Sequence, residues 1–180
     1  MPRLFIGLRP PPEIRRLLIA AMGGVSGARW QSDAQLHLTL RFLGEVPPRL
    51  ADDVAVALGG IRSPAPQVAI AGTGRFARSG RTDAIWAGVQ PAEPIAALHR
   101  KIERAVTLAG AAPEPRAFHP HITLARLARG LGAEAAIDRY LADHAALASP
   151  AFAFDHLMLF ESRLGSDGAV YDTLARWPLG

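Results

Sequence analysis

The sequence contains no cysteine, a single lysine and no run of 18 consecutive apolar residues. The lack of cysteine excludes disulfides and thiolate metal sites, and it makes a reducing compartment the simplest setting. The lack of a long apolar run predicts that no transmembrane helix is present. The first residues, 1–8, also lack the long apolar segment and small-residue cleavage site of a signal peptide. We therefore expect a cytoplasmic protein with no membrane partner.

The composition is that of a folded protein rich in arginine. The chain has 180 residues, of which 49% are apolar, which is enough to bury a real core and argues against disorder. Its formal net charge is +4, and every basic residue except Lys101 is arginine. The arginine fork binds phosphate oxygens in pairs, although a GC-rich genome explains the same bias equally well. A weak preference for an anionic partner remains.

A four-residue pattern occurs twice, 84 positions apart. The two copies are His37-Leu38-Thr39-Leu40 and His121-Ile122-Thr123-Leu124. Random placement predicts about 0.2 His-x-Thr triplets in such a chain, so a duplicated match in two strand-like runs is unexpected. In a strand, alternate residues share a face, so each copy places its histidine and threonine together. Two such strands side by side would present two imidazoles and two hydroxyls to one cleft.

These side chains suit acid–base chemistry on a phosphate. A neutral imidazole can activate water while a protonated one donates to the departing oxygen. Threonine hydroxyls can hold the non-bridging oxygens, where negative charge builds. The residues themselves do not say which histidine is the acid. A metal site built on His37, His119 and His121 is the competing interpretation, but the nearest carboxylates are not interleaved with these histidines. We therefore predict no metal and no cofactor.

The order of elements suggests an internal duplication. Expected strands cover 3–8, 36–43, 68–71, 83–89, 119–126, 152–160 and 170–177, and expected helices cover 11–22, 49–58, 95–108 and 133–147. The order strand, helix, motif strand, helix, strand occurs over 3–71 and again over 84–160. We predict one α+β domain over 1–180, with two lobes related by a pseudo-twofold axis. Two antiparallel-rich sheets would line a central cleft, with helices outside and a crossing loop over 72–80.

Several neighbouring residues are candidates for phosphate or RNA contacts. Simple alternation places Arg41 on the His37 face and Arg126 opposite His121, unless a bulge intervenes. His119 precedes Pro120 and is interpreted as a partly exposed residue before the strand.

Arg75, Phe76 and Arg78 occupy a Gly-rich segment that could follow an RNA backbone and stack on a base, or could be an ordinary exposed hairpin. Trp30, Trp86 and Trp177 are interpreted as packing residues.

The wider pattern resembles the two-histidine phosphoesterase superfamily. Within it, the chain is most similar to the bacterial and archaeal RNA 2′,3′-cyclic phosphodiesterases, once described as 2′-5′ RNA ligases. The residues that carry this are Arg3-Leu4-Phe5-Ile6, Trp30, Leu36 to Gly44, Phe118 to Arg126 and the closing segment Tyr171 to Leu179. The likeness spans nearly the whole chain, and both motifs match.

The resemblance implies a metal-independent hydrolase that opens a terminal 2′,3′-cyclic phosphate to a 2′-phosphate. It implies that His37 is the proton donor and His121 the proton acceptor, that Thr39 and Thr123 bind phosphate oxygens, and that Arg126 assists them. The partner would be RNA with a cyclic-phosphate end, or a small cyclic nucleotide, and the protein is expected to be a monomer. Ligation through a 2′-5′ bond and a non-catalytic module that binds RNA ends are the alternatives.

Overall fold

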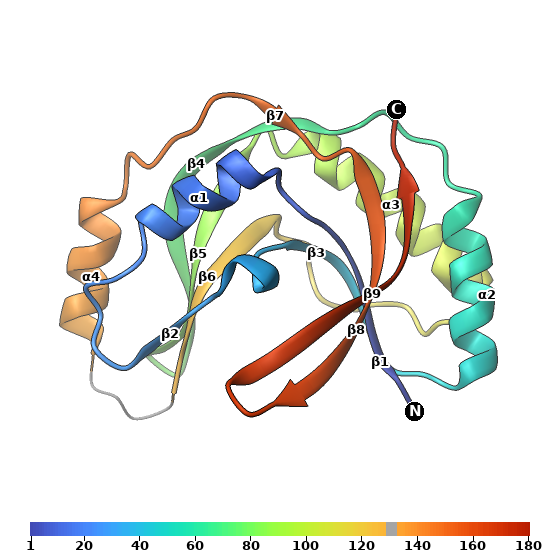
Figure 1. The fold of residues 1–180 in the computed structure, drawn as a ribbon, viewed down its shortest axis with the longest axis horizontal. Helices are drawn as coiled ribbons and strands as arrows, with labels where there is room; N and C mark the ends of the chain where they lie inside the picture. Colours follow the sequence, from blue (N-terminus) through green and yellow to red (C-terminus); the bar gives the residue numbers. More distant parts are fainter. Residues whose placement is uncertain (129–132) are drawn as a thin grey trace.

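The computed structural model describes residues 1–128 and 133–180 (Figure 1). Its elements are β1 (Arg3–Leu8), α1 (Pro12–Ala20), β2 (Ala28–Trp30), the 3₁₀ turn η1 (Asp33–Gln35), β3 (Leu38–Glu45), α2 (Pro48–Gly59), β4 (Gln67–Arg78), β5 (Arg81–Gln90), α3 (Glu93–Leu108), β6 (His121–Leu127), α4 (Glu134–Asp143), β7 (Phe152–Ala153), β8 (His156–Gly165) and β9 (Gly168–Pro178). The helices begin as the sequence suggests: α1, α2 and α3 each have proline in the first turn, where a missing N–H costs nothing.

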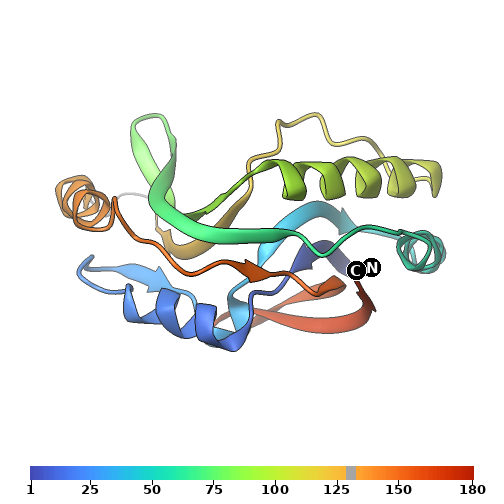
Figure 2. The ribbon, with the colours of Figure 1, turned by 90° about the horizontal axis from the view of Figure 1, so that it is seen from above.

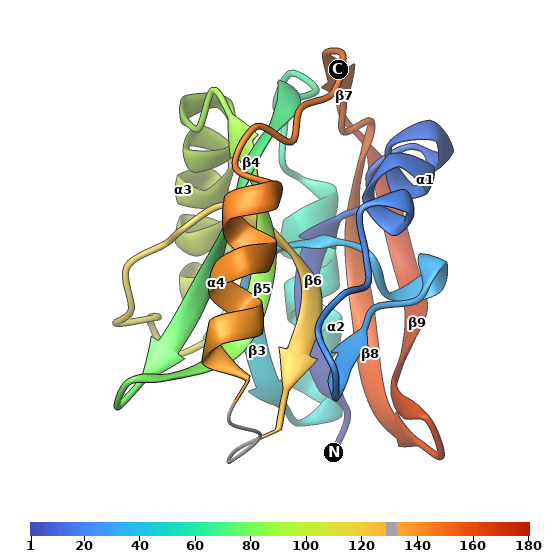
Figure 3. The same ribbon diagram turned by 90° about the vertical axis from the view of Figure 1, so that its left-hand side faces the viewer.

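In the described parts of the chain, nine strands form one curved antiparallel sheet. Its order is β7-β4-β5-β6-β3-β1-β8-β9, with β2 paired to β6. The helices of the described residues surround this sheet, with α4 and α2 towards its two ends and α3 and α1 on opposite sides of it (Figures 1 and 2). Seen from the side, α3 and α1 lie on opposite sides of the strands (Figure 3). The predicted α+β class is confirmed, but the two predicted sheets are one continuous sheet, because β3 and β6 pair at its centre.

The strand order is symmetric about that central pair. Outward from it, β6, β5 and β4 on one side match β3, β1 and β8 on the other. Each side therefore takes its third strand from the other half of the chain: β4 comes from the first half and β8 from the second. The internal duplication stays a prediction, and this order supports it.

Three differences from the sequence prediction have identifiable reasons. The expected crossing loop is mostly strand, because β4 continues to Arg78 and turns tightly at Ser79-Gly80 into β5. The expected strand 152–160 is split, since β7 pairs with β4 whereas β8 pairs with β1. The short β2 was missed because three residues carry too little periodicity.

One apolar core joins the sheet to the helices. Leu18, Val54, Ile102 and Ile137 supply the buried faces of α1, α2, α3 and α4. In the described parts of the chain, no helix is long and apolar enough to cross a bilayer.

Candidate active site

The two motifs meet at the centre of the sheet. Leu38 of β3 pairs with Ile122 of β6 in antiparallel register, and both side chains are fully buried. Continuing this register by one residue places His37 beside Thr123 and Thr39 beside His121. These four polar side chains are half-buried and lie on the face opposite the core. The predicted juxtaposition of two imidazoles and two hydroxyls is therefore present.

Both histidines are held by the same local hydrogen bond. The Nδ1–H of His37 donates to the carbonyl oxygen of Gln35 over 2.7 Å, and that of His121 donates to the carbonyl oxygen of His119 over 2.6 Å. A carbonyl can only accept, so Nδ1 carries the proton in both rings. The reactive lone pair of each neutral imidazole is therefore at Nε2. With the proton on Nδ1, the Nε2 atom of the neutral imidazole can accept a proton and act as a base. Once Nε2 is protonated, the same ring can act as an acid.

The His37 ring is surrounded by aromatic side chains from β1, β8 and β9. Its ring centroid is 4.9 Å from that of Phe5 and 5.1 Å from that of Tyr171. Its Nε2 accepts a hydrogen bond from the Thr39 hydroxyl over 2.9 Å. Burial lowers the pKa of His37 to about 4, and the nearby charge of Arg126 contributes to that lowering. In the free protein this imidazole is neutral at pH 7.

His121 has a matching aromatic surround on the other side. Its ring meets Phe76 of β4 edge-on at 4.7 Å and lies 6.2 Å from Trp86 of β5. Burial also lowers the pKa of His121, and the hydrogen bond to the His119 carbonyl opposes that lowering in part. Phe76 thus belongs to the site through its contact with His121, and the proposed stacking on a base is not needed to explain it.

A β-bulge in each motif strand redirects the residues that follow. In β6, Ala125 pairs with Ile85 while Thr123 pairs with Trp86, so Leu124 is skipped. Two consecutive residues, Leu124 and Ala125, are therefore buried, and alternation resumes with Arg126 exposed on the histidine face. Arg126 lines the same pocket as His121 and Thr123. The bulge that alternation required for this placement is present.

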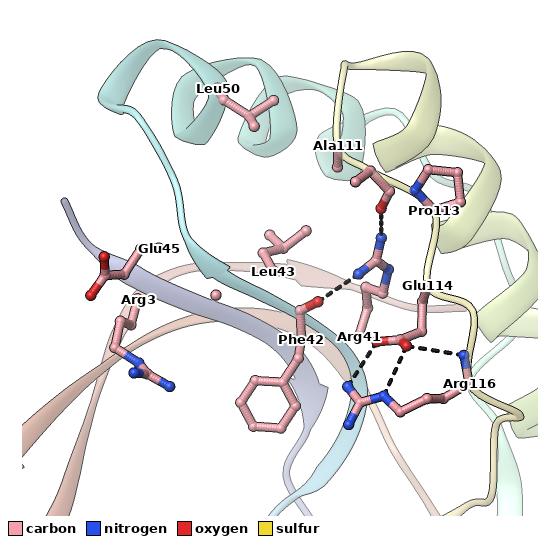
Figure 4. A pocket seen from close by; sticks show the side chains of 12 residues that line it. Arg3, Arg41, Phe42, Leu43, Glu45, Leu50, Ala111, Pro113, Glu114 and Arg116 are labelled. Atoms are coloured by element: carbon pink, nitrogen blue, oxygen red, sulfur yellow. Dashed lines mark hydrogen bonds and ion pairs between the residues drawn. The ribbon is translucent and has the colours of Figure 1, made fainter.

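The same bulge in β3 has the opposite consequence for Arg41. Arg41 pairs with Ile6 and Thr39 with Gly7, so Leu40 is skipped and Arg41 is turned away from the His37 face. Its guanidinium is buried, donates from Nε to Glu103 over 2.6 Å, and also donates to the carbonyl oxygens of Phe42 and Ala112 (Figure 4). The prediction from alternation that Arg41 lies on the His37 face is therefore wrong. Arg41 still borders the pocket that Thr39 and His121 line, but its guanidinium is engaged by Glu103 and two carbonyl groups.

The residue that takes the cleft position in β3 is Phe42, which the sequence analysis missed. Phe42 stands five residues after His37, as Arg126 stands five after His121, and its side chain is 44% exposed. Aligning the two motifs residue by residue would have found it. We call the resulting pocket, of about 360 Å³, the motif cleft; its lining includes Thr39, Phe42, Phe76, His121, Thr123 and Arg126.

The remaining candidates fall into two groups. Arg75 donates to Glu134 over 3.1 Å and also to Asp138, both on α4, so its charge is already paired. Arg78 is exposed at the end of β4, beside a separate hollow. His119 is exposed at the rim of the motif cleft, as predicted.

The tryptophans also divide. Trp86 packs its ring 4.8 Å from that of His119, so it borders the site. Trp30 contacts Tyr140 at 5.3 Å between ring centroids, and both Trp30 and Trp177 pack against the core. Within residues 1–128 and 133–180, no group of three His, Cys, Asp or Glu side chains could hold a metal ion.

Comparison with known proteins gives consistent matches. The model of the 2′-5′ RNA ligase superfamily matches residues 10–165. An RNA 2′,3′-cyclic phosphodiesterase of Aeropyrum pernix is 34% identical over 145 residues, which are 79% of this chain and 81% of the relative. Crystal structures of Escherichia coli LigT complexed with 3′-AMP and of TT0787 of Thermus thermophilus superpose with TM-scores of 0.77 and 0.79. The first is 26% identical and covers 99% of this chain and 98% of its own, and the second is 25% identical and covers 98% and 97%.

Proposed function

The chain belongs to the 2′-5′ RNA ligase superfamily, and on this basis we propose that it hydrolyses the 2′,3′-cyclic phosphate at the end of RNA to a 2′-phosphate. The observation that most directly supports this proposal is the Leu38–Ile122 pair, which brings the histidine and threonine of both motifs to one face of the sheet. The Aeropyrum pernix relative is itself named for this activity.

The reaction is a displacement at phosphorus. His121 Nε2 takes a proton from water as the water oxygen bonds to phosphorus. The bond from phosphorus to the 3′ oxygen breaks, and Nε2–H of His37 donates its proton to that oxygen. This division of roles follows the family pattern. The shared tautomer supports proton transfer through Nε2 in both rings but does not distinguish the two roles, because both Nδ1 atoms are engaged with backbone carbonyls.

The hydrogen-bond donors and charges around the motif cleft suit this displacement reaction. The Thr39 and Thr123 hydroxyls and the Arg126 guanidinium would donate to the non-bridging oxygens, where charge accumulates. The low pKa of His37 in the free protein follows mainly from its burial. A phosphate anion beside it would raise that pKa, so binding of the substrate would itself charge the acid.

The direct test is to incubate the purified protein with RNA ending in a 2′,3′-cyclic phosphate and to identify the product. We expect a 2′-phosphate end and an excess of hydrolysis over 2′-5′ joining of two RNA ends, because water is the more abundant nucleophile. A 3′-phosphate product, or tight binding with no product, would contradict the proposal. A cytoplasmic location and a monomeric state remain predictions.

Chelation of divalent metals is expected to leave the activity unchanged. Among the described residues, no group of three His, Cys, Asp or Glu side chains is arranged to hold a metal ion, and a strained cyclic phosphate needs no Lewis acid. The measurement is the initial rate in excess chelator against the rate with added zinc or manganese. A rate that falls in chelator and returns with either metal would show that the enzyme depends on a metal.

The pH dependence of kcat/KM is expected to be bell-shaped with its maximum below pH 6.5. One imidazole must be neutral and the other protonated, and the free-protein pKa values of both lie below the usual 6.5. As pH rises above these values the acid loses its proton, so kcat/KM falls on the alkaline side. The kcat profile should peak at higher pH, because bound phosphate raises the pKa of its neighbours. A kcat/KM maximum above pH 8 would contradict this assignment.

A further inference from the structure

A second hollow adjoins the motif cleft on the far side of Phe42. This outer pocket has a volume of about 660 Å³ and lies between β1, β3, the start of α2 and the segment that follows α3 (Figure 4). It shares four lining residues with the motif cleft: Arg41, Phe42, Glu114 and Arg116. The two hollows therefore form one groove, and Phe42 stands at their boundary.

Phe42 is built as a firm platform at this boundary. Its ring lies 5.5 Å from that of Phe5, which is itself 1% exposed and packs on the ring of Phe160. One side of Phe42 thus rests on fixed aromatic packing, while 44% of the residue stays exposed to the groove. An exposed, rigid aromatic ring in a groove is the usual stacking surface for a nucleobase.

The charges of the outer pocket favour a base over a second phosphate at its inner end. Arg116 is paired with Glu114 over 2.9 Å, which lowers the pKa of Glu114 to about 2, and Arg41 is paired with Glu103. Paired side chains offer hydrogen-bonding edges with little net charge. Arg3 lies further out, opposite Glu45 in the β1–β3 register, and has no ion-pair partner among the residues that the structure describes.

We propose that the substrate is an RNA of at least two nucleotides, and that its penultimate base stacks on Phe42 in the outer pocket. Arg3 would then face the sugar-phosphate backbone of the RNA. This rests on the proposed function and adds that a cyclic mononucleotide is the poorer substrate. The RNA path would leave the cleft past β3, and not along Arg75 and Arg78, since Arg75 is already paired with α4.

The test compares a dinucleotide ending in a 2′,3′-cyclic phosphate with the corresponding cyclic mononucleotide. Stacking on an aromatic side chain contributes about 1–3 kcal/mol per base, so the dinucleotide should have a kcat/KM about 5- to 150-fold higher. Phe42→Leu keeps an apolar side chain on Phe5 but removes the aromatic face, so it should abolish most of this preference. Phe42→Trp should keep it. Val56→Ala, at a 78% exposed position on the outside of α2, is the matched control and should leave the preference unchanged.

Binding measurements separate this inference from the proposed function. Affinities of a dinucleotide with a 2′-phosphate end and of a nucleoside 2′-phosphate, measured by calorimetry, need no turnover. A preference that Phe42→Leu removes supports the outer pocket even if neither substrate is hydrolysed, a result that would refute only the proposed function. Equal affinities and equal kcat/KM values, or a preference that survives Phe42→Leu, would overturn the inference.

Discussion

Replacing His121 by alanine is expected to lower kcat/KM for cyclic-phosphate-ended RNA by about 10²- to 10⁴-fold, and replacing His37 by alanine should have an effect of the same size. Each imidazole is held by a backbone carbonyl that leaves only Nε2 for proton transfer. The Thr39 and Thr123 hydroxyls titrate far above neutral pH, so neither can take over this task. Because the two histidines would act on one displacement, the double variant should lose little more than either single variant.

The measurement is steady-state hydrolysis together with thermal unfolding. His37 and His121 are half-buried on the cleft face, so their removal should leave the core intact and the melting temperature nearly unchanged. The matched control is His156→Ala, which removes a histidine paired with Asp155 at the surface. It should retain full activity. A His121 variant that kept activity within a few-fold of wild type would rule out the two-histidine mechanism.

Replacing Arg126 and replacing Arg41, the two arginines that follow the motifs at similar spacing, are expected to have different effects: the first on activity and the second on stability. Arg126→Ala removes a cation from the histidine face and should lower kcat by about 10²- to 10³-fold, the usual cost of a lost donor to a charged transition state. Its side chain is exposed, so stability should change little. Arg41→Ala removes a buried guanidinium that donates to Glu103, Phe42 and Ala112. We expect it to lower the free energy of unfolding by about 3 kcal/mol, because Glu103 and two carbonyl groups lose their partner.

Denaturant unfolding and kinetics on the folded fraction distinguish the two effects. At this chain length, about 3 kcal/mol corresponds to a fall of roughly 6–12 °C in melting temperature. Arg41→Lys tests the reason for the loss, since one ammonium cannot reproduce the three directions of the fork. If Arg41→Ala left stability intact but abolished activity, the role given to the β3 bulge would be wrong.

The local sequence was enough to predict which side chains share a face in each motif, where the main helices lie and the α+β class. Alternation within the two motifs placed His37 with Thr39 and His121 with Thr123, and the buried leucine and isoleucine positions confirm that assignment. The expected helices 11–22, 49–58 and 95–108 correspond to α1, α2 and α3, whose first turns each contain proline. The repeated order of elements indicated an α+β protein with one central site. The motif faces and the helix positions depend on neighbours within a few residues, which is the range over which side-chain periodicity acts, whereas the repeat was inferred from the order of elements along the chain.

Tertiary structure alone decided the features that depend on strand pairing. The skipped Leu40 and Leu124 are bulges defined against β1 and β5, which are distant in sequence, and they exchange the faces of Arg41 and Arg126. The single Leu38–Ile122 pair made one sheet of the two that were expected. Because the side-chain period of a strand is two, one extra residue in the pairing reverses every later side chain. No local pattern records that residue, so alternation alone placed Arg41 on the histidine face, whereas the family resemblance had already implied Arg126 and the strand pairing explains why.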